Sequence, residues 1–154
     1  MVKILSPEQL IDLIGKDLGT SEWMTVDQDR INQFAEATND HQFIHVDPEQ
    51  AKAVTPYGGT IAHGFLTLSL LSYLAAGIGV YPEGMVMGIN YGLNKVRFLT
   101  PVKVDSEIRA RGKQLDIASK GHGRYLSTME ITVEIKGETK PALIAEWLGL
   151  YITR

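Results

Sequence analysis

The feature that most constrains the fold is a long segment without a formal charge, IAHGFLTLSLLSYLAAGIGV at residues 61–80. A helix that is apolar on all sides belongs in a protein interior, so the segment predicts a buried helix over residues 64–76, which Gly77 can end. Its length is close to the ~20 residues that span a bilayer. His63, the glycines, the hydroxyl side chains and the lack of flanking Lys or Arg argue against insertion. We therefore expect a soluble protein with no membrane partner.

The second half of the chain shows the alternation of apolar and polar residues that is typical of strands. KVDSEIRAR at 103–111 and STMEITVEI at 127–135 alternate strictly. MVMGINYGLNKVRF at 85–98 and PALIAEWLGLYI at 141–152 give two further candidates. The connections between these strands are too short for crossover helices, which predicts an antiparallel sheet. The pattern indicates an α+β fold in which the sheet wraps around the buried helix.

Capping signals predict three helices in the first half. The first opens in SPEQLIDLIG, with Ser6 as the N-cap and Pro7 at the first helical position. The second starts from Thr25 or Asp27, after an extended piece, and the third follows Asp47 in DPEQAKAV. Between the second and third helices we expect a polar loop around residues 39–46.

Composition excludes several classes of function. The chain has 154 residues, enough for one domain with a core, and we expect one domain over residues 1–154. A formal net charge of −3 without a basic run argues against nucleic acid as the main partner. The absence of cysteine excludes disulfides, thiolate chemistry and a Cys-ligated zinc. Because MVKILSPEQL has too short an apolar run for a secretory signal, we expect a cytoplasmic location.

Asp40 and His45, five positions apart in DHQFIH, are the first candidates for chemistry. A carboxylate and an imidazole that converge on one water can share general-acid and general-base work. On the pair alone, the plainer interpretation is favoured, because such spacings arise often by chance. In that interpretation Asp40 ends the preceding helix and His45 is a satisfied loop histidine.

A metal site is the alternative use of the same region. His41, His45, Asp47 and His63 carry ligand types that suit zinc, iron or manganese. His41 and His45 do not lie on a convincing helix, and helix capping already explains Asp47. We therefore expect no metal.

Two interpretations fit Gly64, and the first concerns its backbone N–H. If it opens the buried helix, its N–H is one of the unpaired donors of the first turn, and a glycine there lets a ligand carbonyl approach closely. A small residue where the helix enters the core explains Gly64 equally well. Ser69 and Ser72 lie farther along, where serines usually hydrogen-bond to a carbonyl one turn earlier.

Taken together, FAEATNDHQFIHVDPEQA and GGTIAHGFLTLSLL resemble the MaoC-like dehydratases of the hotdog superfamily. This group contains the (R)-specific enoyl-CoA hydratases and the nodulation-protein-N-like hydratases. The shared pattern is D-x4-H-x-D-x3-A, a Gly-rich turn and then A-H-G-x-L. The resemblance extends over nearly the whole chain and implies a hotdog fold, with an antiparallel sheet around a long central helix.

The resemblance also implies an activity and a site. Asp40 and His45 would activate a water that attacks C3 of a trans-2-enoyl-CoA, with a proton delivered to C2, giving the (R)-3-hydroxyacyl product. The N–H of Gly64 would hold the thioester carbonyl, and Ser72 and His63 would bind substrate. The family uses no cofactor or metal. Its members form homodimers that join two sheets edge to edge, with the active site at the subunit interface.

One departure from the family pattern concerns the loop between the pair. Many members have Asn-Pro where this chain has Gln42 and Phe43, so the acyl chain length is open. A hotdog acyl-CoA thioesterase and a non-catalytic acyl-thioester-binding module are the rival functions. Both would hold an acyl thioester at the start of the helix.

Overall fold

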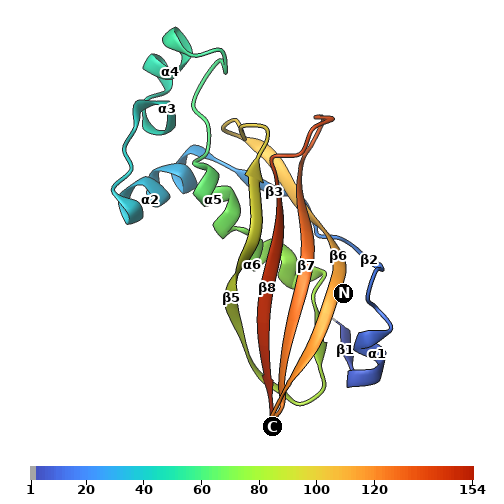
Figure 1. Cartoon of the computed structure of the whole chain (residues 1–154). Helices are drawn as coiled ribbons and strands as arrows, with labels where there is room; N and C mark the ends of the chain where they lie inside the picture. The colour runs from blue at the N-terminus through green and yellow to red at the C-terminus, as the bar shows by residue number, and fades with distance from the viewer. Residues whose placement is uncertain (1–2) are drawn as a thin grey trace.

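The computed structural model describes residues 3–154 and has an α+β architecture (Figure 1). Its main sheet is six-stranded and antiparallel. The strand order is β2-β6-β7-β8-β5, so that β5 forms one edge. The strand β3 also pairs with β6, next to β2. The strands are β2 (Asp17–Thr20), β3 (Met24–Val26), β5 (Met85–Phe98), β6 (Ser106–Gly121), β7 (Arg124–Ile135) and β8 (Leu143–Thr153). The predicted antiparallel sheet is confirmed.

The alternation in the sequence sets which face of the sheet meets the helix. Ile108 and Ala110 of β6 and Ile131 and Val133 of β7 are completely buried in the core, while the residues between them face the other side. The start of β6 differs from the prediction, since the strand begins at Ser106 and not at residue 103. Asp105 has a left-handed backbone with φ of 64°, which interrupts the extended conformation there.

The predicted central helix is present as three consecutive helical segments along one face of the sheet (Figure 1). They are α5 (Gly64–Ser69), α6 (Leu71–Leu74) and the 3-10 turn η1 (Ala75–Gly77). Leu70 lies between α5 and α6 and keeps right-handed helical angles, with φ of −66° and ψ of −12°. The side chain of Ser69 donates to the carbonyl of Phe65 at 2.7 Å, as expected for a serine in a helix.

The expectation that this segment is buried on all sides is wrong for the single chain. Leu66, Leu71 and Leu74 pack into the core, but Phe65 and Tyr73 are each 69% exposed on the opposite side of the helix. The sheet covers only one face of the helix, which leaves a second apolar face open. No helix in the described part of the chain is long and apolar enough to cross a membrane.

The N-terminal helices follow their capping residues. Ser6 caps α1 (Pro7–Ile11) with a complete capping box, Asp27 caps α2 (Gln28–Thr38), and Asp47 caps α4 (Pro48–Val54). The alternative start at Thr25 is wrong, because Thr25 lies in β3. Four elements were not expected. These are the strand β2, a single helical turn, α3 (Phe43–Val46), and the parallel pair of β1 (Lys3–Leu5) with β4 (Val80–Pro82).

Candidate active site

Asp40 follows the end of α2, which places it near the start of α5. Asn39 adopts the left-handed conformation, with φ of 57°, as the C-cap of α2, a position that asparagine tolerates well. The chain then turns, and Asp40 is exposed just before α3. The backbone N–H of Gln42 donates to the Asp40 carboxylate at 3.4 Å, a long and local contact. The carboxylate is therefore accessible to water.

His45 lies on α3, where a loop was expected, and only 7% of it is exposed. Its Nδ1 lies 2.7 Å from the carbonyl oxygen of Ile61. Because a carbonyl only accepts hydrogen bonds, Nδ1 carries the proton and Nε2 keeps its lone pair. The backbone carbonyl of His45 accepts from the side chain of Gln28 at 2.8 Å, and Gln28 accepts from the hydroxyl of the buried Thr60. His45 is therefore fixed at both its ring and its backbone.

His63 precedes α5 and packs directly on His45. The two rings are stacked, with centroids 3.8 Å apart and planes 24° apart, and His63 is only 3% exposed. One oxygen of the Asp40 carboxylate and one ring nitrogen each of His45 and His63 all lie within 4.8 Å of one another. A water that makes hydrogen bonds of about 2.8 Å to two groups spans roughly 4.5 Å between them. The spacing therefore suits a bridging water.

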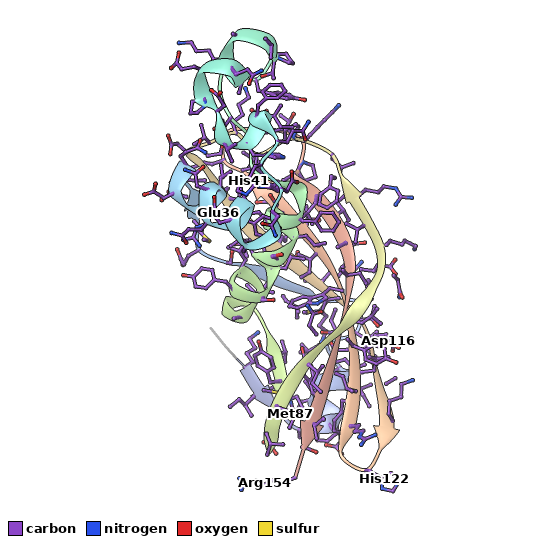
Figure 2. The ribbon with its side chains drawn as sticks, turned by 90° about the vertical axis from the view of Figure 1, so that its left-hand side faces the viewer. Glu36, His41, Met87, Asp116, His122 and Arg154 are labelled. Atoms are coloured by element: carbon purple, nitrogen blue, oxygen red, sulfur yellow. The ribbon has the colours of Figure 1, made fainter. Side chains whose placement is uncertain are left out.

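The same geometry is unfavourable for a metal. An ion bound by both histidines would lie in both ring planes, about 2.1 Å from each nitrogen. Stacked rings with nearly parallel planes do not direct their lone pairs to such a point. The other two candidate ligands lie elsewhere. His41 is on the surface, with its Nδ1 3.7 Å from Oε1 of Glu36 (Figure 2). The Asp47 carboxylate accepts a hydrogen bond from the backbone N–H of Gln50.

Burial changes the pKa of His45. It lowers the pKa of His45 below its usual value of 6.5, and the neighbouring His63 adds to this lowering. The hydrogen bond with Ile61 and the charge of Asp40 act in the opposite direction. The net effect keeps the imidazole neutral at physiological pH, which is the state that a general base needs.

Gly64 lies beside His45, as the first residue of α5. Both residues line a cavity of about 270 Å³ that also includes Phe98, Thr100 and Val102. A Cβ atom on Gly64 would meet the ring of Phe98 at 3.1 Å, which is tight. The first-turn N–H groups of a helix have no acceptor within the helix, so the Gly64 amide is available to a ligand. Nothing in the sequence links Phe98 to this site, because only the register of β5 brings it there.

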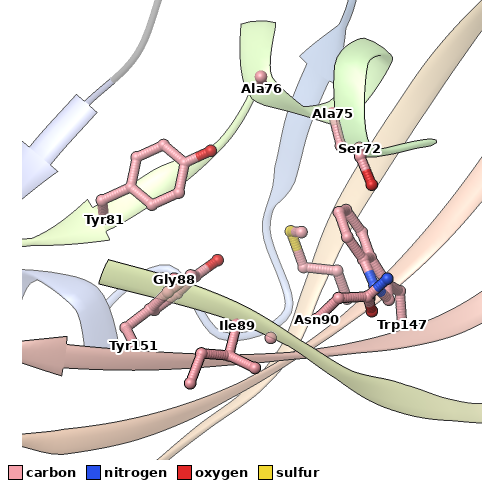
Figure 3. A pocket seen from close by; sticks show the side chains of 11 residues that line it. Ser72, Ala75, Ala76, Tyr81, Gly88, Ile89, Asn90, Trp147 and Tyr151 are labelled. Carbon is pink, nitrogen blue, oxygen red and sulfur yellow. The ribbon is translucent and has the colours of Figure 1, made fainter. Parts of the chain in front are cut away.

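Ser72 lies apart from this cavity, farther along the helical segments. It lines a separate groove of about 220 Å³ with Tyr81, Asn90, Trp147 and Tyr151 (Figure 3). The indole N–H of Trp147 donates to the Asn90 side chain at 2.6 Å. Figure 3 shows the hydroxyl groups of Tyr81 and Tyr151 directed toward the space between the helix and the strands. Burial raises the pKa of Tyr151 to about 12, so its hydroxyl stays protonated.

Comparison with known proteins gives one consistent family. The model of the "MaoC like domain" matches residues 10–139. Nodulation protein N of Rhizobium leguminosarum bv. viciae is 53% identical over 138 residues, which cover 89% of this chain and 85% of that protein. The 3-hydroxyacyl-thioester dehydratase Z of Mycobacterium tuberculosis is 47% identical over 138 residues, covering 90% of each.

A solved structure extends the similarity to the fold. The (R)-hydratase of A. caviae involved in PHA biosynthesis superposes with a TM-score of 0.70 at 22% identity. The match covers 88% of this chain and 94% of that one. At this level of identity the likeness concerns the fold alone, and it confirms the arrangement of sheet and central helix that the sequence resemblance implied.

Proposed function

Since this chain belongs to the MaoC-like domain family, we propose that it is an (R)-specific enoyl-CoA hydratase that converts trans-2-enoyl-CoA to (R)-3-hydroxyacyl-CoA reversibly. Membership of a dehydratase family supports the assignment of this chain to the hydro-lyases. The observation that carries the finer proposal is the spacing of Asp40 and His45. An exposed carboxylate and a buried, neutral imidazole approach each other within 4.8 Å beside the cavity at Gly64.

In the proposed reaction Asp40 and His45 hold one water between them. Nε2 of His45 accepts a proton from the water as its oxygen forms a bond to C3 of the enoyl group. The protonated His45 then gives this proton to C2, so that the elements of one water are added across the double bond and no other reactant is needed. His45 suits this role because its Nδ1–H is committed to the Ile61 carbonyl, which leaves Nε2 as the basic nitrogen.

Negative charge develops on the thioester oxygen as the water attacks. In the proposal the N–H of Gly64 donates to this oxygen. A preorganised donor aimed at developing charge is typically worth ~10²–10³ in rate. The lack of a side chain at Gly64, next to the ring of Phe98, leaves room for the carbonyl to reach the amide.

The acyl chain would run from this cavity along α5 and α6 toward Ser72. The groove at Ser72 has a mostly apolar wall formed by Ala75, Met129, Trp147 and their neighbours. This path explains why polar residues precede the most apolar segment of the chain, since the substrate has a reacting polar head and a hydrocarbon tail.

A homodimer would complete the site, with two copies of β5 pairing edge to edge. The free edge of the sheet carries exposed apolar side chains, among them Met87, Ile89 and Tyr91. Met87 is labelled in Figure 2. Unpaired, apolar edge strands favour association, and monomeric proteins usually protect them. The exposed helix residues Phe65 and Tyr73 provide a second apolar surface for the same partner.

The test is to incubate the purified protein with trans-2-enoyl-CoA while measuring enoyl absorbance and free thiol together. Loss of absorbance without thiol release supports hydration. Release of CoA thiol would instead identify a thioesterase. Saturable binding by calorimetry with neither change would indicate an acyl-thioester-binding module.

A further inference from the structure

His63 has an unusual combination of contacts for a buried histidine. Its Nε2 lies 3.0 Å from the backbone carbonyl oxygen of Asp40, so Nε2 carries the proton and donates. Its Nδ1 is buried and has no hydrogen-bond partner in the described part of the chain. Buried polar atoms are nearly always paired, and an exception calls for an explanation. A phenylalanine or leucine would fill this space without leaving an acceptor unpaired.

The ring of His63 lies between two other rings. Phe34 of α2 is tilted against it with centroids 5.1 Å apart, and His45 is stacked on it at 3.8 Å. Stacking on a flat neighbour restricts rotation of the His45 ring about its side-chain bonds. The hydrogen bond of His45 with Ile61 fixes the same ring in its plane. Together these contacts hold Nε2 of His45 in one direction.

The Nε2–H of His63 reaches across 23 residues of sequence to the segment that carries Asp40. Among the described residues, the Asp40 carboxylate itself accepts only the long hydrogen bond from Gln42, two residues away. The hydrogen bond from His63 is thus a tertiary restraint on the position of Asp40. One side chain therefore contacts both members of the pair, the imidazole of His45 by stacking and the backbone of Asp40 by donation.

We propose that His63 is a positioning residue, which sets the spacing between the Asp40 carboxylate and the His45 imidazole by contacting both. The inference rests on the proposed hydratase function for its kinetic consequences. The role differs from the predicted one of a substrate ligand, because the hydrogen bond made by the Nε2–H of His63 goes to the protein backbone. In this role His63 acts through Asp40 and His45, by its hydrogen bond to the Asp40 carbonyl and by stacking on the His45 ring.

The charges around His63 add a consequence for pH. The titratable groups that face it are His45 and Asp40, while Glu36 and His41 pair with each other on the surface. Two stacked imidazoles do not readily hold two protons, because the like charges repel at this distance. His63 thus lowers the proton affinity of His45. Replacing His63 with an uncharged side chain should raise the pH at which His45 titrates.

Two substitutions separate the two contacts of His63. His63→Gln keeps a donor near the position of Nε2 and removes the ring, whereas His63→Phe keeps a ring and removes the donor. We expect each to lower kcat at least about 10-fold with a smaller change in KM, and to move the acidic limb of the kcat/KM profile to higher pH. The matched control is His41→Gln, which replaces an exposed histidine next to Asp40 and should change neither quantity.

A measurement that does not depend on turnover accompanies the kinetics. Imidazole resonances of the four histidines are followed by NMR over pH, and the His45 signal is assigned by its loss in His45→Gln. Circular dichroism gives the folded fraction, so that rates refer to folded protein. A higher titration midpoint for His45 in either His63 variant, with reduced kcat, supports the proposal.

Unchanged kcat and an unchanged His45 midpoint in a folded His63→Gln or His63→Phe protein would overturn it. If a variant loses thermal stability but keeps a normal kcat per folded molecule and the same His45 titration midpoint, the role of His63 is structural only, and the proposal is also overturned. If the wild-type protein shows no hydratase activity, the proposed function fails separately. The NMR titration still decides the effect of His63 on His45.

Discussion

Gly64→Ala is the substitution whose effect can be worked out most fully from the structure. The new Cβ atom would lie 3.1 Å from Cδ1 and Cε1 of Phe98 and 3.3 Å from its Cγ. Such contacts require the ring to yield by a few tenths of an ångström. Phe98 is 49% exposed, so the ring has room to move. Alanine is also the better helix former, by up to ~1 kcal/mol.

These two effects on folding oppose each other. We expect the free energy of unfolding to change by less than about 1 kcal/mol, which corresponds to a shift of the melting temperature of no more than roughly 4 °C for a chain of this size. The effect on catalysis should be much larger. In the proposed function the thioester oxygen reaches the Gly64 amide through the space that the methyl group would occupy, and loss of one such donor typically costs ~10²-fold or more in kcat. A 10²-fold loss corresponds to about 2.7 kcal/mol in the activation barrier.

The assay is the initial rate of enoyl-CoA hydration, measured beside thermal unfolding. Gly59→Ala is the matched control, because its Cβ would meet only Val104 at an ordinary 3.8 Å. The double variant Gly64→Ala/Phe98→Leu tests whether a displaced ring causes the loss. We expect the double variant to stay slow, since the methyl group remains beside the amide. A wild-type rate in Gly64→Ala, or full recovery in the double variant, would refute the role of the amide.

Four further predictions follow from the site and the edge strand. His45→Gln should lower kcat by about 10²-fold or more in a protein that stays folded, and a steady-state assay with circular dichroism checks this. The acidic limb of kcat/KM should have its midpoint below the usual histidine value of 6.5, because burial lowers the pKa of His45; a limb above 6.5 would contradict the geometry. The same lowered pKa makes the contribution of His45 to the free energy of unfolding depend on pH. This contribution is complete above pH 6.5 and is lost as the pH falls from 6.5 toward the folded-state pKa, because the unfolded chain binds the proton more readily. Urea unfolding at pH 7.5 and 5.5 measures the difference. Ile89→Lys on β5 should shift the protein from dimer to monomer in light scattering, whereas Lys113→Glu on β6 should not.

The local features of the fold could be predicted from the sequence because their causes are local. Ser6, Asp27 and Asp47 cap the helices that their positions indicated, and each does so through a hydrogen bond to a residue three positions later. The alternation in residues 127–135 gave the buried face of β7, since a strand repeats every two residues. These effects act within a few residues, where the sequence shows them directly.

The features that sequence reasoning missed depend on contacts between distant residues. Gln28 and Thr60 fix the backbone of His45. Gln28 lies in α2 and Thr60 in the GGTIAHG stretch before α5, and the sequence does not indicate that the two side chains meet. The turn α3 forms inside a polar segment because its residues pack and bond against the chain near Ile61. The exposure of Phe65 could not be predicted either, because a charge-free sequence does not indicate how many of its faces the sheet covers.

The roles of Asp40 and His45 could be predicted only from the resemblance to the family. From spacing alone, the pair was more simply explained as a helix end and a loop histidine. The structure brings the two side chains within reach of one water, although five positions of sequence separate them. What brings them together is the left-handed turn at Asn39 followed by α3.

The most direct test of this account compares the wild-type protein with Asp40→Asn on a short and a medium-chain trans-2-enoyl-CoA, with chiral analysis of the product. Asp40 is exposed, and within residues 3–154 its carboxylate lies beside the two histidines and accepts one long, local hydrogen bond, so the variant should fold normally. The account predicts rapid loss of enoyl absorbance, an (R)-3-hydroxyacyl product, and a drop of at least about 10²-fold in kcat for Asp40→Asn. An (S) product, or equal rates in the two proteins, would contradict it.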